Sequence, residues 1–465
     1  MSNTIGNLFK GDKGIWMVFF FLCIVSIVEV YSASTMLTYK GGSYITPILK
    51  HIFLLGLGLT AMVVTANINC GYFKFLTPFV LGGAFVLLLI VLAIGTATNG
   101  AQRWINIGPI QFQPSELAKG ALILSTAQIL SSLQTENGAD PRAFRYILGV
   151  CGGIIPFIMV ENLSTAALLC AVVLMMMFIG RVPMRQIGKL LGAVVILGAF
   201  MLSMIMMFGH AEENTEPNKQ NLTEQVQTES KKEKGAIGKV FHRFDTWKGR
   251  IDKFLDSKEL TPKDVDLDED AQESYAKVAI ATSNVVGKGP GNSDQCDFIS
   301  QAFSDFIYAI IIEEMGIEGA FGVAMLYIIL LFRTGRIANR CETSFPAFLA
   351  MGLALLLVTQ ALFNMMVAVG MVPVTGQPLP LISRGGTSTI TNCIYIGVIL
   401  SISRSAKRKQ ELVVEPMPQN GDATPSATVS TTDNSDIAGN ADNAPEEHIL
   451  EKKYHNNNHH NNIYY

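Results

Sequence analysis

The residues best suited to acid–base chemistry surround Asp305, which directly precedes a long apolar run within Ser304–Ile310. Two interpretations of this carboxylate are open. As a helix cap, it would accept hydrogen bonds from backbone N–H groups and complement the helix dipole, which is the commoner role of Asp at such a position. As a general base beside a water-filled cavity, it would take a proton from a substrate hydroxyl, an effect typically worth about 10²–10⁴-fold in rate.

Two further carboxylates, Glu313 and Glu314, follow two turns along the same apolar run. Charged side chains are costly at membrane depth, so they usually mark a polar cavity or a functional path. On a water-exposed re-entrant helix, the same two charges would have a low free-energy cost. The pair therefore predicts either a polar cavity or an interruption in a membrane helix.

A third set of charged residues comprises Arg103, Glu116 and Lys119. Pro114 suits the start of a helix, and Glu116 and Lys119, three residues apart, share one face of it. One interpretation is a self-neutralising ion pair that lets this helix enter a bundle. The other is that Lys119 and Arg103 bind an anionic group, such as a diphosphate, from the outer leaflet. Spacing alone leaves both interpretations open, because buried charges in helical bundles serve both as structural ion pairs and as binding groups.

Residues 373–388 combine several prolines and glycines with Ser383, Gly385 and Gly386 in a stretch that has no acidic residue. So many helix breakers cannot form one regular helix. The pattern predicts an irregular re-entrant segment, which is tolerated only where it is buried in protein or lines a wet cavity. For most positions taken singly, a helix break without chemistry is the commoner role. The glycine-rich stretch at 287–291 is typical of turns rather than of a phosphate cradle.

The scaffold that must position these residues is membrane-embedded, because 49% of the 465 residues are hydrophobic and only 16% are charged. The net charge of −3 provides no basic field for binding nucleic acid. The seven cysteines show no disulfide framework and no CxxC metal spacing. The absence of a GxxxxGK[ST] motif disfavours a transporter that hydrolyses ATP itself.

A spanning helix needs about 20 mainly apolar residues, because lipid offers no partners for backbone groups. On this criterion we predict an all-α polytopic membrane protein with ten transmembrane helices. The eighth helix is the least regular, and we expect a short re-entrant helix followed by a span from Gly319 to Phe332. The ten predicted spans are approximately 14–34, 48–66, 75–95, 115–133, 144–160, 163–180, 188–208, 306–333, 345–371 and 386–404.

Orientation follows from the bias of Lys and Arg toward short cytoplasmic segments. With the N-terminus inside, the short outer segments hold only Lys40, Lys50, Arg103 and Arg384, whereas the inner segments are rich in both residue types. Both termini are therefore expected in the cytoplasm. The predicted parts are a cytoplasmic N-terminus at 1–13, spans 1–7 at 14–208, an extracytoplasmic loop at 209–304, a re-entrant segment with spans 8–10 at 305–404, and a disordered cytoplasmic tail at 405–465.

Within the predicted extracytoplasmic loop, residues 210–235 have the composition of a solvated insertion. Residues 236–270 and 271–286 have apolar spacings typical of amphipathic helices, which we expect at the outer membrane surface.

Four ordered stretches together resemble motifs of the SEDS family (shape, elongation, division and sporulation), membrane peptidoglycan glycosyltransferases with ten transmembrane helices. The resemblance covers about residues 14–408. It depends on NGAQRWI and QPSELAK within 99–119, GKGPGNS at 287–293, SDFIYAIIIEEMG at 304–316 and PVTGQPLPLISRGGTS at 373–388.

The resemblance implies that the substrate is lipid II, a disaccharide-pentapeptide on undecaprenyl diphosphate, and that Asp305 is the catalytic base. It implies substrate-binding roles for the residues that match the family's cavity and re-entrant motifs. A divalent cation, Mg²⁺ or Mn²⁺, would help to offset the diphosphate charge, although no sequence signal requires one. The implied substrate-binding residues are Arg103, Glu116, Lys119, Glu313, Glu314, Ser383, Gly385 and Gly386.

The sequence also departs from the family pattern. Glu161–Ala166 replaces a common proline-aspartate-leucine-glycine stretch, and Arg384 stands where tyrosine is common. The Gly11–Trp16 opening, the YSAS end of the first predicted span and the basic, disordered cytoplasmic tail are more similar to the cell-division member than to the elongation member.

The implied setting is the division septum of a bacterial plasma membrane. The expected partners there are a class B penicillin-binding protein, which is a transpeptidase, and other membrane proteins of the division machinery. A lipid II flippase and a non-catalytic division scaffold are the alternatives to an enzyme.

Overall fold

The computed structural model describes residues 11–35, 45–98, 101–107, 110–208, 271–295 and 304–414. All of them belong to one compact unit, Met1–Glu415. Most of the predicted extracytoplasmic loop, including the insertion at 210–235 and the predicted helices at 236–270, lies outside the described residues, as does the tail beyond Val414.

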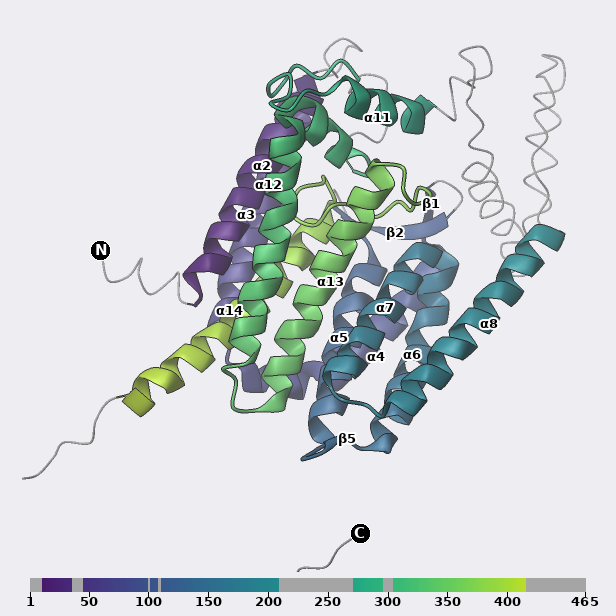
Figure 1. Cartoon of the computed structure of the whole chain (residues 1–465), viewed down its shortest axis with the longest axis vertical. Helices are drawn as coiled ribbons and strands as arrows, with labels where there is room; N and C mark the ends of the chain where they lie inside the picture. The colour runs from purple at the N-terminus through teal and green to yellow at the C-terminus, as the bar shows by residue number, and fades with distance from the viewer. Residues whose placement is uncertain are drawn as a thin grey trace, which may run out of the picture. The chain divides into compact units, whose positions relative to one another are not determined.

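Long helices occupy every segment that the sequence predicted to span a membrane (Figure 1). Within the described ranges, six of them are long and apolar enough to cross a membrane: α2, α3, α4, α6, α12 and α13. The long helices are α2 (Lys13–Thr35), α3 (Ile45–Asn67), α4 (Cys70–Ile94), α5 (Pro114–Ser132), α6 (Pro141–Glu161), α7 (Leu163–Ile179), α8 (Met184–Phe208), α12 (Ile307–Ala338), α13 (Ser344–Ala368) and α14 (Thr387–Val414).

Large apolar side chains cover the outward faces of these helices. Phe75 and Phe79 of α4 are 71% and 64% exposed, and Ile196 of α8 is 72% exposed. In water, each exposed Å² of apolar surface would forgo about 25 cal/mol, whereas a lipid tail is an equally good neighbour. The fold is therefore that of an all-α polytopic membrane protein.

Helix α5 lies inside the bundle and packs against α4, α6 and α13. Twelve of its nineteen residues are buried, among them the polar Ser115, Glu116, Lys119, Ser125 and Thr126. Because protein rather than lipid surrounds it, α5 does not need the apolar composition of a lipid-facing helix. This explains why it falls outside the six helices that hydropathy identifies.

Helix α12 is broken at Gly316, whose φ of 71° and ψ of −176° are not helical. The sequence predicted an interruption in this helix, followed by a span from Gly319, and the break lies three residues earlier. A first stretch, which carries Glu313 and Glu314, thus precedes a longer straight one. The break separates the polar end of the helix from the part that is long enough to cross a membrane.

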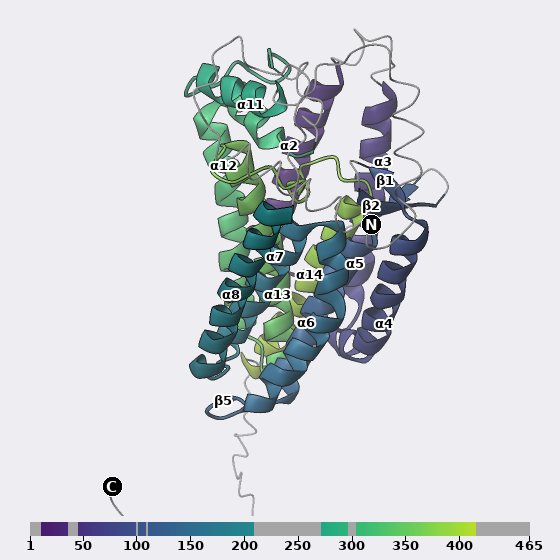
Figure 2. The same ribbon diagram turned by 90° about the vertical axis from the view of Figure 1, so that its right-hand side faces the viewer.

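Short strands, which the sequence did not predict, complete the fold. Strands β1 (Thr96–Thr98), β2 (Ala101–Ile107) and β3 (Ile110–Phe112) form an antiparallel sheet in the order β1-β2-β3. Strands β4 (Gln134–Thr135) and β5 (Gly138–Ala139) form a separate hairpin. Helix α11 (Ala271–Thr282) confirms one predicted helix of the large loop. Figures 1 and 2 place α11 at one end of the bundle and β5 at the other, with β1 and β2 on the α11 side of its middle.

Candidate active site

Asp305 lies two residues before the start of α12 and is not its N-cap. The N-cap of α12 is Phe306, which makes no side-chain capping hydrogen bond. The Asp305 carboxylate is half-buried and accepts a hydrogen bond from Ser304 Oγ at 3.1 Å. The geometry thus differs from the simple cap that the sequence left open.

Arg103, on strand β2, faces the same point in space as Asp305. A Cβ atom built on Gly376 would lie 3.6 Å from Arg103 Nη1 and 3.7 Å from Asp305 Oδ2. Gly376 has a φ of +68°, a left-handed conformation that favours glycine. Arg103 also donates from Nε to the carbonyl of Glu161 at 2.9 Å, which fixes its side chain. A cation and a carboxylate therefore converge over a position that has no side chain.

Residues 369–386 form the predicted irregular segment between α13 and α14. Side-chain amides attach it to the bundle. Asn364 Nδ2 donates to the Asp305 carbonyl at 2.9 Å and to the Gln377 carbonyl at 2.8 Å. Gln377 Nε2 donates in turn to Thr165 Oγ1 of α7 at 2.6 Å. Asn364 thereby holds this segment and Asp305 in a fixed relation.

Ser383, Gly385 and Gly386 lie at the end of this segment, just before α14. Ser383 Oγ donates to the Ser304 carbonyl at 2.7 Å and accepts from the backbone N–H of Leu379 at 2.7 Å. Gly386 has a left-handed φ of +56°. Ser383 therefore contacts the residue that precedes Asp305, and its hydroxyl is already occupied by these two hydrogen bonds. The predicted contacts of these three residues with substrate remain predictions.

Glu116 and Lys119 form the ion pair that was one of the two interpretations of their spacing. Lys119 Nζ lies 2.8 Å from Glu116 Oε1, and both side chains are buried. Lys119 Nζ also donates to Gln360 Oε1 of α13 at 2.8 Å. Lys119 is only 1% exposed. Its hydrogen bond to Gln360 joins α5 to α13. Substrate binding by either residue remains a prediction.

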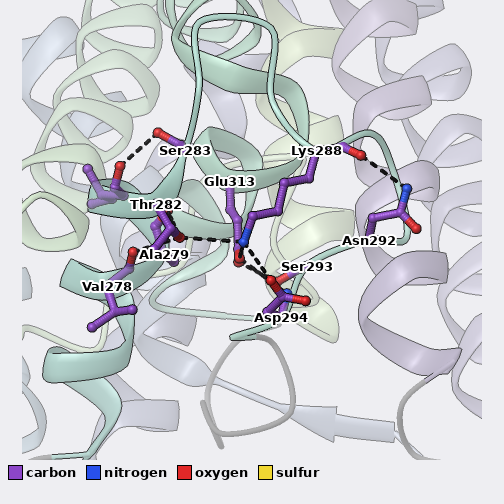
Figure 3. Close-up of polar contacts among 10 residues, drawn as sticks. Val278, Ala279, Thr282, Ser283, Lys288, Asn292, Ser293, Asp294 and Glu313 are labelled. Carbon is purple, nitrogen blue, oxygen red and sulfur yellow. Dashed lines mark hydrogen bonds and ion pairs between the residues drawn. The ribbon is translucent and has the colours of Figure 1, made fainter.

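Glu313 and Glu314 organise the glycine-rich loop at 285–295 rather than pointing into open space. Glu313 accepts from Lys288 Nζ at 2.7 Å and from Ser293 Oγ at 2.5 Å (Figure 3). Glu314 accepts from the backbone N–H of Gly291 at 3.1 Å. The two carboxylates thus accept hydrogen bonds from the backbone and from side chains of this loop.

Lys288 is the centre of this loop's charges. Its Nζ also lies 2.8 Å from Asp294 Oδ2 (Figure 3). The hydrogen bonds with Asp294 and then Glu313 raise the pKa of Lys288, so it stays charged throughout the physiological range. In the described part of the chain, no group of three His, Cys, Asp or Glu residues is placed to hold a metal ion.

Sequence reasoning missed the three amides that fix the site, Gln360, Asn364 and Gln377. Each is at most 4% exposed, and each bonds a backbone or side-chain group of another segment. The available signal was an uncharged polar side chain within an apolar helix or motif, because such a group must find a partner there.

The chain matches a family model described as a cell cycle protein, FTSW_RODA_SPOVE, over residues 12–227 and 236–408. It is 27% identical over 401 residues to the peptidoglycan glycosyltransferase MrdB of Escherichia coli K12, covering 85% of this chain and 94% of the relative. It is 30% identical over 397 residues to the probable peptidoglycan glycosyltransferase FtsW of Geobacter sp. strain M18, covering 84% and 96% respectively.

Two solved structures share the fold. One is a chain of a peptidoglycan synthase complex, with a TM-score of 0.60, 24% identity and coverage of 85% of this chain and 98% of that one. The other is the rod shape determining protein RodA of Thermus thermophilus, with a TM-score of 0.56, 21% identity and coverage of 86% and 98%.

Proposed function

The chain belongs to the FtsW, RodA and SpoVE family of cell cycle proteins, that is, the SEDS family, and we propose that it polymerises lipid II into β-1,4-linked glycan strands. The observation that carries this proposal is the convergence of Asp305 and Arg103 over Gly376. A carboxylate beside a fixed cation, at the membrane-exterior end of a helical bundle, suits deprotonation of a sugar hydroxyl during displacement of an anionic leaving group.

In the proposed reaction, Asp305 takes the proton from the 4-hydroxyl of the glucosamine unit of the acceptor lipid II. The resulting oxygen nucleophile attacks the muramic C1 of the growing chain. As the new C–O bond forms, the bond from C1 to the diphosphate breaks, and undecaprenyl diphosphate leaves with the electron pair. Arg103 would offset the negative charge that develops during this exchange.

Two hydrogen bonds to the main chain support this role by holding Asp305 in place. Asn364 binds the carbonyl of Asp305, and Ser383 binds the carbonyl of Ser304. Both contacts use the main chain, and the Asp305 side chain is half-buried. Fixing a base in this way reduces the reorganisation needed when substrate binds.

We propose further that all ten long helices span the membrane, that both termini are cytoplasmic, and that Asp305 faces outward. The protein would act at the division septum with a class B penicillin-binding protein. The relatives include proteins named both FtsW and MrdB at similar identity. We favour the division role because of the Gly11–Trp16 opening and the polar tail.

The test is polymerisation of purified lipid II by the wild type and Asp305→Asn, each reconstituted with the transpeptidase partner. Asp305→Asn keeps the size of the side chain and an oxygen that can accept from Ser304, but it removes the base. We expect strand synthesis to fall at least about 10²-fold, in line with the loss of general-base catalysis. Glu318→Gln is a matched control, because Glu318 is an exposed carboxylate on the same helix.

Each alternative function gives a distinct outcome. A flippase would move labelled lipid II between leaflets without making strands. A scaffold would support division equally well with Asp305→Asn. Strand synthesis by Asp305→Asn at the wild-type rate would refute the assignment of the base.

A further inference from the structure

The cationic side chains near Asp305 differ in whether they already have partners. Lys119 is buried in its ion pair, and Arg103 already donates to a backbone carbonyl. Arg384 is half-buried, yet none of the described residues offers its guanidinium a hydrogen bond or an ion pair. Burial lowers the pKa of Arg384, and no carboxylate in the described part of the chain acts in the opposite direction. Leaving a cation partly desolvated without a counter-ion is costly, so this position is suited to an external anion.

Flanking contacts fix the backbone that carries Arg384. Ser383 donates to the carbonyl of Ser304 at 2.7 Å, which places Arg384 next to the residue that precedes Asp305. On the other side, Thr387 Oγ1 donates to the carbonyl of Gln111 on β3 at 3.1 Å. Arg384 is therefore held between the strand that leads into α5 and the candidate catalytic carboxylate.

A second group without a partner lies one turn away. Ser388, in the first turn of α14, is 2% exposed, and its Oγ has no hydrogen-bond partner among the described residues. Ser388 Cβ and Oγ lie 3.1 and 3.6 Å from the position of a Cβ atom built on Gly385, so this side chain adjoins the turn that follows Arg384. Neither Gly385 nor Gly386 has a side chain that could cover the N-terminus of α14.

We propose that Arg384, Ser388 and the first turn of α14 form a binding site for the phosphate oxygens of a lipid-linked diphosphate. The guanidinium offers a planar fork of N–H donors that matches phosphate oxygens. The N-terminus of a long helix adds the positive end of the helix dipole and first-turn N–H groups other than that of Ser388, which donates to the Gly385 carbonyl at 3.0 Å. Ser388 supplies one neutral donor.

Phosphate oxygens near this site have two sources, the diphosphate of the substrate and the headgroups of anionic phospholipids. The position of Arg384, one residue after the Ser383–Ser304 contact, favours the substrate, because its diphosphate must lie close to the reacting carbon beside Asp305. The inference deepens the proposed function and rests on it for the identity of the ligand.

The test measures binding of farnesyl diphosphate, a water-soluble lipid diphosphate, to the purified full-length protein in a neutral detergent. We expect Arg384→Met to raise the Kd about 10–100-fold, the effect of losing a charge-assisted hydrogen bond, and Arg384→Lys to have an intermediate effect. Ser388→Ala should raise the Kd several-fold. Arg340→Met is the control, since Arg340 is an exposed arginine in the turn between α12 and α13.

The melting temperature separates binding from folding. Because no described residue hydrogen-bonds to Ser388 Oγ, Ser388→Ala should melt at the wild-type temperature or above it, while binding the diphosphate more weakly. A lower melting temperature with unchanged Kd would mean that the hydroxyl is structural and would overturn its part in the site.

The inference and the proposed function fail in different ways. If the wild type does not polymerise lipid II but binds farnesyl diphosphate through Arg384, the proposed function is wrong and the site stands. If the wild type polymerises lipid II and Arg384→Met keeps both its KM for lipid II and its Kd, the inference is wrong. Loss of phosphatidylglycerol binding alone in Arg384→Met would assign the site to phospholipid and also overturn the inference.

Discussion

At the scale of single residues, the candidate site depends on a glycine, a position that has no side chain. Gly376 leaves open the point onto which Asp305 and Arg103 converge. Its left-handed φ of +68° also makes glycine the residue that adopts this backbone without strain. The position therefore links a backbone requirement to the access of substrate to the proposed base.

Gly376→Ala tests this link. We expect it to cost about 1–2 kcal/mol in the free energy of unfolding, because alanine is strained in the left-handed region. Strand synthesis should fall at least tenfold, since the added methyl group would lie 3.6 Å from Arg103 Nη1 and 3.7 Å from Asp305 Oδ2. Melting temperature and polymerisation of lipid II, measured on the same sample, give both values.

Gly322→Ala provides the comparison for this variant. Gly322 lies in α12, and a Cβ atom there would meet nothing within 4 Å. Alanine should therefore leave activity unchanged and slightly stabilise the helix. Equal activity of the two alanine variants would show that the open point over Gly376 has no role in the reaction.

The types of the site residues were predictable from sequence, whereas their meeting point was not. Asp305, Arg103 and the irregular segment each stood out as charges or helix breakers in apolar surroundings. Their convergence depends on contacts between segments far apart in the chain, such as that of Asn364 with Gln377 and Asp305. No local pattern encodes such contacts, because amide hydrogen bonds are specified only once the helices have packed.

At the scale of elements, two glycines join the loop at 285–295 to the break in α12. A Cβ atom on Gly287 would lie 2.3 Å from the backbone nitrogen of Gly316, and one on Gly316 would lie 2.2 Å from the carbonyl oxygen of Val285. The backbones of the two segments are therefore in direct contact. Glu313 and Glu314 then bind the loop that follows Gly287.

Gly287→Ala should separate these elements. We expect a loss of about 3 kcal/mol or more in the free energy of unfolding, which combines the strain of a left-handed alanine with a clash against backbone that cannot move aside. Gly291→Ala is the matched variant, because Gly291 has a similar φ of +85° but a Cβ atom there would meet nothing within 4 Å. It should cost only the strain of about 1–2 kcal/mol. Equal melting temperatures for the two variants would contradict a close backbone contact.

The contact of α5 with α13 depends on the buried pair Glu116–Lys119 and its bond to Gln360. Lys119→Met should destabilise the protein by about 3–5 kcal/mol, because it leaves the Glu116 carboxylate buried without its counter-ion. The double variant Glu116→Gln/Lys119→Met should recover much of that loss. Thermal unfolding of Glu116→Gln, Lys119→Met and the double variant gives the coupling energy. Strictly additive changes in the free energy of unfolding would argue against a direct pair.

The same double variant separates the structural role of the pair from substrate binding. If the pair only joins helices, a stable Glu116→Gln/Lys119→Met protein should polymerise lipid II with the KM of the wild type. A raised KM in a protein of normal stability would instead support the predicted contact of these residues with substrate.

The positions of the long helices were predictable because lipid imposes a simple rule on length and apolarity. The rule also explains its own exceptions in the structure. Helix α5 is polar because protein surrounds it, and α12 is irregular where Gly316 breaks it. The short strand β2, which carries Arg103, gave no signal that we recognised, since its few residues lie between helices and pair only with other short strands.

At the scale of the whole molecule, the straight part of α12 relates the two ends of the bundle. It runs from the break at Gly316 to Ala338, and at 1.5 Å per residue it is about 33 Å long, enough to cross a hydrocarbon core of about 30 Å. In the proposed topology, the loop held at Gly316 and the turn that contains Arg340 therefore lie on opposite sides of the membrane. Since Asp305 precedes the same helix, the side on which this loop lies fixes the side on which the proposed chemistry takes place.

Cysteine labelling in spheroplasts can determine that side. In a cysteine-less protein, Asp294→Cys and Arg340→Cys introduce thiols at positions that are exposed in the structure. A membrane-impermeant maleimide should label Asp294→Cys in intact spheroplasts and Arg340→Cys only after permeabilisation. The exchange of Asp294 removes one exposed ion-pair partner of Lys288, which should cost at most about 1 kcal/mol, so the loop should keep its position. The opposite labelling pattern would place Asp305 in the cytoplasm, away from any outward-facing lipid II, and no polymerase mechanism based on this carboxylate would then be tenable.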